Sequence, residues 1–470
     1  MLVFLAELNG LETWATDIAS AYLEAYTDEK VYIIAGPEFG DLEGHTVIIE
    51  KALYGLRTSG ARYHDRFADT LRDMGFTQCK NEPDLWMRDA GTHYEFICVY
   101  VDDLMAIMKD PARFFETLRK KYRYKLKGVE EPSYHLGGDF FRDPDGTLAW
   151  GAKRYIVRLL ENYTRDHGSP PPKFRSPMAK DCHPELDRSI ELGLEGIKKY
   201  QSWIGALQWV VTLGRFDVQV AVMTLSSFRV APRLGHWECI IRVLGYLRMT
   251  KDGAIRFRLE ELELEDYMKK ESKYDWSSSV YAGVTEDIPE DCPVPRGKSV
   301  QLSTYVDASL LHCRVTGRSV SGIIHFLNNT VIDTFCRKQN VVEAATYGSE
   351  FYAARLSVQQ IIDLRITLRY MGVPLKGPAF MFGDNESVVK SSTIPSSTLK
   401  KRHNSLSYHT VRAAIAAGFI KFWHIPGKEN IADVLTKHLE PGVLGPLVRP
   451  HLFWQGPKVA YRAKRAREDD

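Results

Sequence analysis

The stretch EFICVYVDDLMAIM, residues 95–108, places two adjacent acids between two apolar runs. Each run has the length of a buried strand, and neighbouring side chains on one strand point to opposite faces of a sheet. A tight turn between two strands is therefore expected to present Asp102 and Asp103. Burying a carboxylate is costly unless it is paired or binds a metal. The dipeptide alone is equally compatible with a hairpin tip whose acids face water.

Short apolar runs alternate with helical patterns around this stretch, as in KVYIIA (30–35) and YHDRFADTLRDMGF (63–76). Residues 1 to about 140 are therefore predicted to form a mixed α/β domain. Next, YHLGGDFFRDPDGTLAW (134–150) predicts a hairpin with Asp145-Gly146 at its turn, and KRYIVRLLENY (153–163) predicts a helix. The proline-rich SPPPKFRSP (169–177) predicts a linker.

The second half of the chain begins with helical patterns over residues 197–250 and continues with a charged, polar connector over 259–300. From Leu302 a second α/β pattern starts. Its strands include STYVDAS (303–309) and AFMFGD (379–384), and residues 350–372 predict a long helix.

The bulk properties exclude little, because Lys plus Arg is 62 and Asp plus Glu is 60, which gives a net charge of +2. That balance neither requires nor excludes a nucleic-acid partner. A chain of 470 residues is expected to form two to four domains. The 7 cysteines include no C-x-x-C pair, so a reducing compartment is expected rather than a zinc site or a disulfide framework. MLVFLAELNG (1–10) is interpreted as a buried segment, not a signal peptide, and no membrane span is expected.

Four acids of the second half fall at strand ends and helix starts, namely Asp307, Glu350, Asp384 and Asp433. Acids in such places can converge on one pocket of an α/β sheet. Four converging carboxylates repel one another unless cations neutralise them, so a metal site is inferred. Each acid alone is also compatible with a helix cap or an edge charge.

Three segments of the first half carry a family resemblance. TDIASAYLEA (16–25), IEKALYGLRTSGARYHDRF (49–67) and YVDD (100–103) occur in this order, and together they resemble the reverse transcriptases of copia-type LTR retrotransposons. The resemblance implies a right-hand polymerase palm and thumb. Most of the fingers are expected to be missing, because only sixteen residues precede Asp17. Asp17 and Asp102 would hold two Mg²⁺ ions, with Asp103 as a third carboxylate.

The same resemblance implies roles for other residues. Tyr22 would lie beneath the incoming sugar and exclude a 2′-hydroxyl, although a core aromatic is the alternative. Gly60, Arg62 and Tyr100 would line the nucleotide pocket. Leu136-Gly137-Gly138 resembles the primer grip, or is simply a turn. The chain has Thr58 where the family usually carries Gln.

The middle of the chain, residues 200–228 and 235–257, resembles the family segment that follows the polymerase. Arg242, Arg248 and Lys251 are candidates for phosphate contacts there, with a solvated face as the alternative.

The four acids of the second half lie in a pattern that resembles the RNase H domain of the same elements. Its other parts are Lys338-Gln339, Asn385, Tyr408-His409 and Ala432. The resemblance implies a mixed five-stranded sheet with flanking helices, in which Asp307, Glu350, Asp384 and Asp433 hold two Mg²⁺ ions, or Mn²⁺ as an alternative. Lys338, Gln339, Asn385 and His409 would contact nucleic acid.

We therefore predict an α/β (mixed α+β) chain with five parts. These are a reverse transcriptase palm with the fingers largely missing (1–168), a helical thumb or connection region (169–258), a polar connector (259–300), an RNase H-like domain (301–442) and a C-terminal tail (443–470).

The predicted function is RNA-directed DNA synthesis with degradation of the RNA of the hybrid, by two-metal-ion catalysis. The partners would be an RNA template, a DNA primer strand, the RNA–DNA hybrid and deoxynucleoside triphosphates, and the location cytoplasmic particles or the nucleus. The alternatives are an RNase H whose truncated polymerase half is inactive, and an inactive nucleic-acid-binding remnant.

Overall fold

The computed structural model describes residues 1–269, 274–399 and 401–453. The chain forms two compact units. The first combines Met1–Leu136, Asp287–Val300 and Asp363–Lys376, and the second combines Gly137–Glu286, Gln301–Ile362 and Gly377–Asp470. The predicted domain borders along the chain stay predictions. Most of the predicted C-terminal tail, residues 454–470, lies outside the described residues.

The first unit is built on a six-stranded sheet with the order β4-β5-β6-β7-β1-β8. Helix α2 (Ser59–Asp73) buries Tyr63, Phe67 and Leu71, which lie four residues apart on one helical face. They share a core with α3 (Pro111–Lys120) and the sheet. The strands are β1 (Glu12–Ile18), β4 (Thr77–Gln78), β5 (Leu85–Asp89), β6 (Tyr94–Tyr100), β7 (Asp103–Met108) and β8 (Leu126–Glu130).

The remaining helix and strands of this unit lie outside the six-stranded sheet. Helix α1 (Leu2–Asn9) buries Phe4, Leu5, Ala6 and Leu8, as expected for a buried segment. Strands β2 (Tyr26–Ile34) and β3 (Thr46–Lys51) form a separate two-stranded sheet, and β9 spans Tyr134–His135.

The second unit begins with the predicted hairpin. Strands β10 (Gly138–Arg142) and β11 (Leu148–Gly151) are antiparallel, and Arg142 faces Leu148 across a turn that contains Asp145-Gly146. Strands β12 (Ala254–Arg256) and β18 (Leu452–Phe453) extend this sheet. Four helices share one apolar core beside it: α4 (Lys153–His167), α5 (Leu194–Thr212), α6 (Gln219–Ser226) and α7 (Leu234–Met249). The last three confirm the helical pattern expected over residues 197–250, and α4 confirms the helix expected over residues 153–163.

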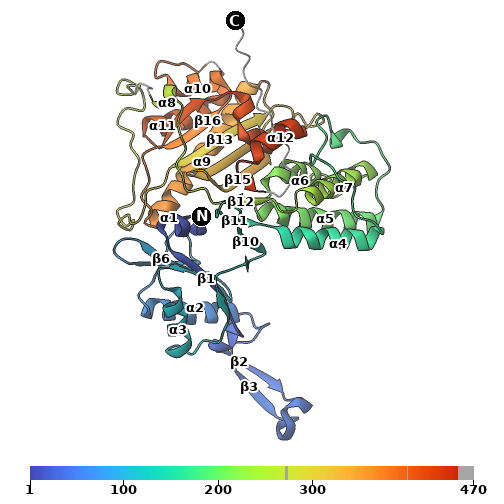
Figure 1. Cartoon of the computed structure of the whole chain (residues 1–470), viewed down its shortest axis with the longest axis vertical. Helices are drawn as coiled ribbons and strands as arrows, with labels where there is room; N and C mark the ends of the chain where they lie inside the picture. Colours follow the sequence, from blue (N-terminus) through green and yellow to red (C-terminus); the bar gives the residue numbers. More distant parts are fainter. Residues whose placement is uncertain (270–273, 400, 454–470) are drawn as a thin grey trace. The chain divides into compact units, whose positions relative to one another are not determined.

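A mixed five-stranded sheet follows, with the order β15-β14-β13-β16-β17. Strands β13, β14 and β15 are antiparallel, whereas β16 and β17 run parallel to β13. This is the five-stranded mixed sheet that the resemblance implies (Figure 1). The strands are β13 (Leu302–Ser309), β14 (Val320–Leu327), β15 (Thr330–Lys338), β16 (Ala379–Gly383) and β17 (Ile420–His424). The flanking helices are α9 (Thr346–Tyr370), α10 (Glu386–Thr393), α11 (Ser405–Ala416) and α12 (Pro441–Val448).

Two described parts of the polar stretch 259–300 pack against other segments of the chain. Leu262, Leu264 and Met268 of its first part, which includes α8 (Asp266–Lys269), pack with Phe382 and Trp423 of the five-stranded sheet. Its last part, Asp287–Val300, belongs to the first unit. The apolar residues Leu262, Leu264 and Met268 are spaced along this acid-rich segment. They can therefore pack on the face of the sheet while the acids between them stay in water.

Candidate functional site

Strand pairing in the five-stranded sheet brings two predicted acids together. Val306 on β13 lies opposite Gly383 on the parallel strand β16. Asp307 and Asp384 each follow one of these residues, so they lie side by side at the carboxyl ends of neighbouring parallel strands. Ligand sites in α/β sheets commonly form at such ends.

The other two acids come from a helix and a short turn. Glu350 lies near the start of α9 and is 8% exposed. Asp433 lies in the 3-10 helix η7 (Ile431–Leu435), which begins at a cap where the Asn430 side chain accepts from the Ala432 amide at 3.1 Å. The Asn430 amide also donates to the Val306 carbonyl at 3.0 Å, and so ties this turn to β13.

These residues form a carboxylate cluster. One oxygen each from Asp307, Glu350 and Asp384 lies within 4.8 Å of the others. Burial, then the charges of Asp307 and Asp384, raise the pKa of Glu350 well above its usual value. Burial and Asp307 raise the pKa of Asp384 and also raise that of Asp433, to about 7. Burial is the largest cause of each rise in pKa, and repulsion between the carboxylates adds to it, which a bound cation would relieve.

Two neighbours of Asp433 complete the cluster. The ammonium of Lys437 lies 2.6 Å from Asp433 Oδ1 and 3.3 Å from Asp307 Oδ1. The hydroxyl of Thr436 donates to Asp307 Oδ2. Asp307 itself is 1% exposed. Asp307 and Asp433 are therefore held together by these hydrogen bonds and by one cation.

A glycine allows this framework to approach the sheet. A Cβ atom at Gly322, which lies opposite Asp307 on β14, would meet Thr436 Cγ2 at 2.6 Å and the Ala432 carbonyl at 3.0 Å. Any larger residue at this position would push the turn that carries Asp433 away from Asp307.

The raised pKa of Asp433 predicts how stability depends on pH. The usual pKa of an aspartate is 3.8, whereas that of folded Asp433 is about 7. Between these values the folded state binds more protons than the unfolded state, so this group's contribution to stability falls as pH rises. We expect the Tm of the metal-free wild-type chain, minus that of Asp433→Asn, to fall between about pH 4 and pH 7. A difference that stays constant across this range would contradict the assignment.

The acids of the first unit occupy the predicted turn. Asp17 on β1 lies directly opposite Asp103 on β7, and Val101-Asp102 forms the tight connection between β6 and β7. Val101 has a φ of 55°, which is strained for a β-branched residue and is of a kind that often marks functional turns. The hairpin confirms that a turn presents Asp102 and Asp103.

The electrostatics link these three acids. Burial, then the charges of Asp102 and Asp17, raise the pKa of Asp103. Asp17 is 43% exposed and lies 3.7 Å from the Lys127 ammonium. Within the described part of the chain, the three do not form a group with all ligand oxygens inside 4.8 Å. This site is therefore more open than the first cluster.

Three of the four predicted nucleotide-binding residues line one cavity. Tyr22, Gly60 and Tyr100 border a cavity of about 310 Å³ in the first unit. Tyr22 stacks in a tilted arrangement on Tyr54, with ring centroids 4.4 Å apart. The fourth residue, Arg62, is absent from the lining and lies 3.3 Å from Asp65 and 3.6 Å from Asp28.

The predicted primer-grip residues lie where the chain passes from the first unit to the second, after Leu136. Leu136 and Gly137 have φ angles of 46° and 87°, and Leu136 is 42% exposed. A Cβ atom at Gly138 would overlap the Trp150 ring, at 1.9 Å from Nε1. The glycine is therefore required for packing, whatever else the turn does.

The predicted nucleic-acid contacts of the second unit have different surroundings. Gln339 is 2% exposed, and its amide donates to Ser321 Oγ at 3.0 Å and to the Ser349 carbonyl at 2.9 Å, so in this structure its role is structural. The Lys338 ammonium donates to Ser227 at 2.9 Å. Asn385 caps α10 through the Val388 amide.

The two histidines of the α11 region each have one partner. His409 on α11 is exposed and lies 2.6 Å from the Tyr281 hydroxyl. His403 lies 3.3 Å from Glu343. Both remain near the surface, where they can meet a ligand.

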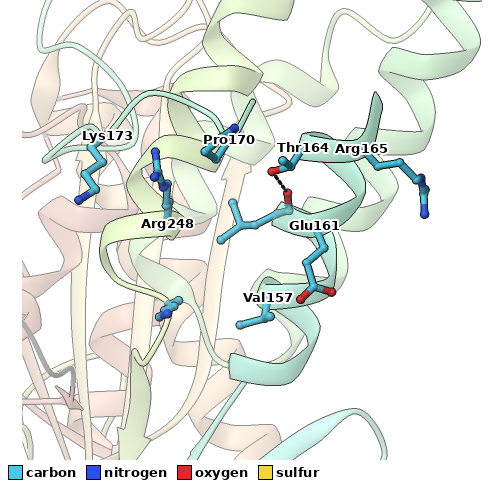
Figure 2. A pocket seen from close by; sticks show the side chains of 9 residues that line it. Val157, Glu161, Thr164, Arg165, Pro170, Lys173 and Arg248 are labelled. Atoms are coloured by element: carbon cyan, nitrogen blue, oxygen red, sulfur yellow. Dashed lines mark hydrogen bonds between the residues drawn. The ribbon is translucent and has the colours of Figure 1, made fainter. Parts of the chain in front are cut away.

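A basic cleft of about 690 Å³ lies between α4, the segment that follows it and the C-terminal end of α7 (Figure 2). Arg165, Lys173, Arg248 and Lys251 line it, with Glu161 as the acid. Arg248 donates to the Pro171 carbonyl at 2.9 Å and so secures the proline-rich linker. Arg242 does the same through Ser176, at 3.0 Å. For these two arginines the structure therefore shows a packing role, and the phosphate contacts stay a prediction.

The first third of the chain is similar in sequence to a known family of polymerases. Residues 1–169 match the family model described as reverse transcriptase (RNA-dependent DNA polymerase). Residues 1–169 are therefore similar to reverse transcriptases, and the mixed five-stranded sheet lies beyond them in the chain. More particularly, most of the chain is similar to the Pol polyproteins of copia-type retrotransposons.

Two relatives illustrate the match. The chain is 25% identical over 426 residues to the retrovirus-related Pol polyprotein from transposon RE1 of Arabidopsis thaliana, with 90% of this chain and 26% of the relative covered. It is 23% identical over 450 residues to that from transposon TNT 1-94 of Nicotiana tabacum, with 93% and 30% covered. The chain spans between a quarter and a third of the length of these relatives.

Solved structures give only a weak overall superposition. A foamy viral protease-reverse transcriptase in complex with RNA/DNA hybrid matches with a TM-score of 0.29 and 11% identity, covering 92% of this chain and 68% of that one. An N-terminal RNase H domain from Mycobacterium tuberculosis matches with a TM-score of 0.24 and 15% identity, covering 32% and 96%. In the described residues, no helix is long and apolar enough to cross a membrane.

Sequence reasoning missed three residues of these sites. Tyr54 lies within the Leu-Tyr-Gly-Leu-basic segment, and Thr436 and Lys437 end the segment that carries Asp433. Each of the three lies inside a segment that carries the family resemblance, so its position in the sequence could have marked it as a candidate site residue. Their roles depend on contacts across more than one element, which the motifs alone do not reveal.

Proposed function

We propose that the carboxylate cluster of the second unit hydrolyses the RNA strand of an RNA–DNA hybrid. The observation that carries this proposal is the convergence of Asp307, Glu350 and Asp384 within 4.8 Å at the ends of parallel strands. Asp433, which belongs to the same electrostatic cluster, adds a fourth carboxylate. Buried acids in such a group need cations, and hard oxygen ligands suit Mg²⁺ or Mn²⁺.

The donor set fits two divalent ions, with Asp307, Glu350, Asp384 and Asp433 as ligands. When bound, such ions supply an activated water and neutralise the charge that develops on the leaving 3′-oxygen. The protein's own contribution is to hold the ligands in place. Thr436 orients Asp307, and the Asn430 cap positions Asp433 against β13. Discrimination of the hybrid from other duplexes would come from duplex shape and RNA 2′-hydroxyls.

We infer a second activity, RNA-directed DNA synthesis, for the first unit. Asp17 opposite Asp103, with Asp102 in the adjoining turn, gives three acids of the kind that hold Mg²⁺ in polymerases. The neighbouring cavity bordered by Tyr22, Gly60 and Tyr100 is the place for a deoxynucleoside triphosphate. An RNA template and a DNA primer strand are the corresponding partners. For the location of this activity we propose cytoplasmic particles, the nucleus, or both, as the resemblance to retrotransposons implies.

A panel of labelled substrates tests the nuclease. With Mg²⁺, we expect the chain to cleave the RNA strand of an RNA–DNA hybrid, and to leave single-stranded RNA, duplex RNA and duplex DNA intact. Equal cleavage of all four would point to a different nuclease. No cleavage of the hybrid, with Mg²⁺ or Mn²⁺, by a folded chain would favour an inactive nucleic-acid-binding remnant.

Primer extension tests the polymerase. Incorporation of deoxynucleotides on an RNA template that Asp102→Asn abolishes would establish this activity. If the hybrid is cleaved but no primer is extended, the first unit is a scaffold for an RNase H.

A further inference from the structure

Lys437 occupies an unusual place in the carboxylate cluster. Its ammonium lies 2.6 Å from Asp433 Oδ1 and 3.3 Å from Asp307 Oδ1. The main chain at Lys437 is tied to this turn, because the Lys437 amide donates to the Asp433 carbonyl at 2.9 Å. Lys437 therefore brings a positive charge, on a short tether, to two of the four acids that we assign as ligands.

The same carboxylate oxygens would be needed by a divalent ion. Asp307 Oδ1 and Asp433 Oδ1, which contact the ammonium, are among the few oxygens that these two residues can offer. Asp307 Oδ2 already accepts from Thr436, which leaves Oδ1 as its more available ligand atom. A divalent ion and an ammonium about 4 Å apart repel by several kcal/mol at the dielectric constant of a partly buried site.

Lys437 also has a route out of the cluster. Its side chain is 38% exposed, whereas those of Asp307 and Asp433 are 1% and 14% exposed. Lysine is a flexible point charge on a four-carbon stem, so it can swing toward water without moving the backbone. The acids, in contrast, are held in place by the sheet and by the capped turn.

We propose that Lys437 is a tethered internal cation that competes with divalent ions for Asp307 and Asp433. It neutralises the cluster while no metal is bound and withdraws into solvent when metal enters. This inference rests on the proposed metal-dependent nuclease and adds a regulatory element to its site. It makes metal binding weaker, and hence more reversible, than four acids alone would make it.

The sign of one measurement separates this role from a structural one. If Lys437 competes, removing its charge strengthens metal binding. If Lys437 merely supports the turn that carries Asp433, removing it weakens metal binding, because the ligand is no longer held in place.

The experiment is calorimetric titration of Mn²⁺ into the full chain at fixed pH, without nucleic acid. We expect Lys437→Met to lower the Kd of the site by on the order of tenfold, because a unit charge at this range is worth more than 1.4 kcal/mol. Lys437→Arg, which keeps the charge, should stay near wild type. Asp384→Asn should abolish this binding event and so identify it. Metal-free Lys437→Met should also melt at a lower temperature than wild type, and Mn²⁺ should restore its Tm.

Lys390→Met is the matched control. Lys390 also forms a pair with an acid four residues earlier, Glu386, at 2.7 Å, but on the surface of α10. The Lys390→Met variant should leave the Kd for Mn²⁺ unchanged. An equal or higher Kd for Lys437→Met would overturn the inference while leaving the metal site intact. Absence of any Asp384-dependent Mn²⁺ binding in wild type and in Lys437→Met would instead overturn the proposed metal site, and this inference with it.

Discussion

Glu350→Gln is expected to slow cleavage of an RNA–DNA hybrid by about 10³-fold or more, because a ligand of a metal site that supplies several kcal/mol is lost. The same variant should be at least as stable as wild type when no metal is present. Glu350 is 8% exposed, and its charge is opposed first by burial and then by Asp307 and Asp384. A neutral amide of the same shape removes that repulsion.

Two readouts check this prediction. Single-turnover cleavage of a labelled hybrid with Mg²⁺ gives the rate, and thermal melting in a chelator gives the stability. Glu386→Gln is the control, because Glu386 is 62% exposed on nearby α10, and it should leave both values near those of wild type. A Glu350→Gln variant that is folded and cleaves at the wild-type rate would remove Glu350 from the site. A large loss of metal-free stability would show that the residue is needed for packing.

Asp217→Ala should be the most destabilising single change outside the two sites. Asp217 is 1% exposed, and it accepts from the Arg215 guanidinium at 2.9 and 2.7 Å and from the Tyr246 hydroxyl at 2.8 Å. Removing it leaves Arg215, which is fully buried, without a counter-charge. Breaking a buried pair in this way costs about 3–5 kcal/mol.

Urea unfolding of the chain measures this loss as a lower midpoint urea concentration, and hence a lower free energy of unfolding, for the transition of the second unit. Asp166→Ala, which changes a side chain that is 50% exposed, should stay within about 0.5 kcal/mol of wild type. The double change Arg215→Met with Asp217→Leu should recover much of the loss, because no uncompensated charge remains. A cost of less than about 1 kcal/mol for Asp217→Ala would mean that water or a neighbour satisfies Arg215.

Much of the second site could be predicted from the sequence, because an acid that follows a predicted strand must lie at the end of that strand in the sheet. Asp307 and Asp384 follow apolar strands, and the carboxyl ends of parallel strands meet at one edge of a sheet. The turn at Asp102-Asp103 could be predicted for a related reason. The apolar runs on either side form strands, so the two acids between them must lie at the turn that joins these strands. The four helices beside the hairpin follow from periodic apolar residues such as those of α4.

Other features depend on contacts that no local pattern contains. Lys437 could be recognised as part of a motif, but its position between Asp307 and Asp433 requires the turn to dock on β13. Gln339 was expected to contact nucleic acid, yet its side chain is buried, and its amide donates to the Ser321 hydroxyl and the Ser349 carbonyl. The acid-rich sequence 259–300 concealed three apolar residues that cover a sheet. The return of residues 287–300 and 363–376 to the first unit had no sequence signal that we recognised.

The most direct test of the central proposal is cleavage of a labelled RNA–DNA hybrid in Mg²⁺ by wild type and by Asp384→Asn, with both shown to be folded by circular dichroism. We expect wild type to cut the RNA strand and the variant to leave it intact, because Asp384 is one of the three acids whose oxygens lie within 4.8 Å of one another. Equal cleavage by the two proteins, or none by wild type, would contradict the assignment of the second unit as an RNA–DNA hybrid ribonuclease.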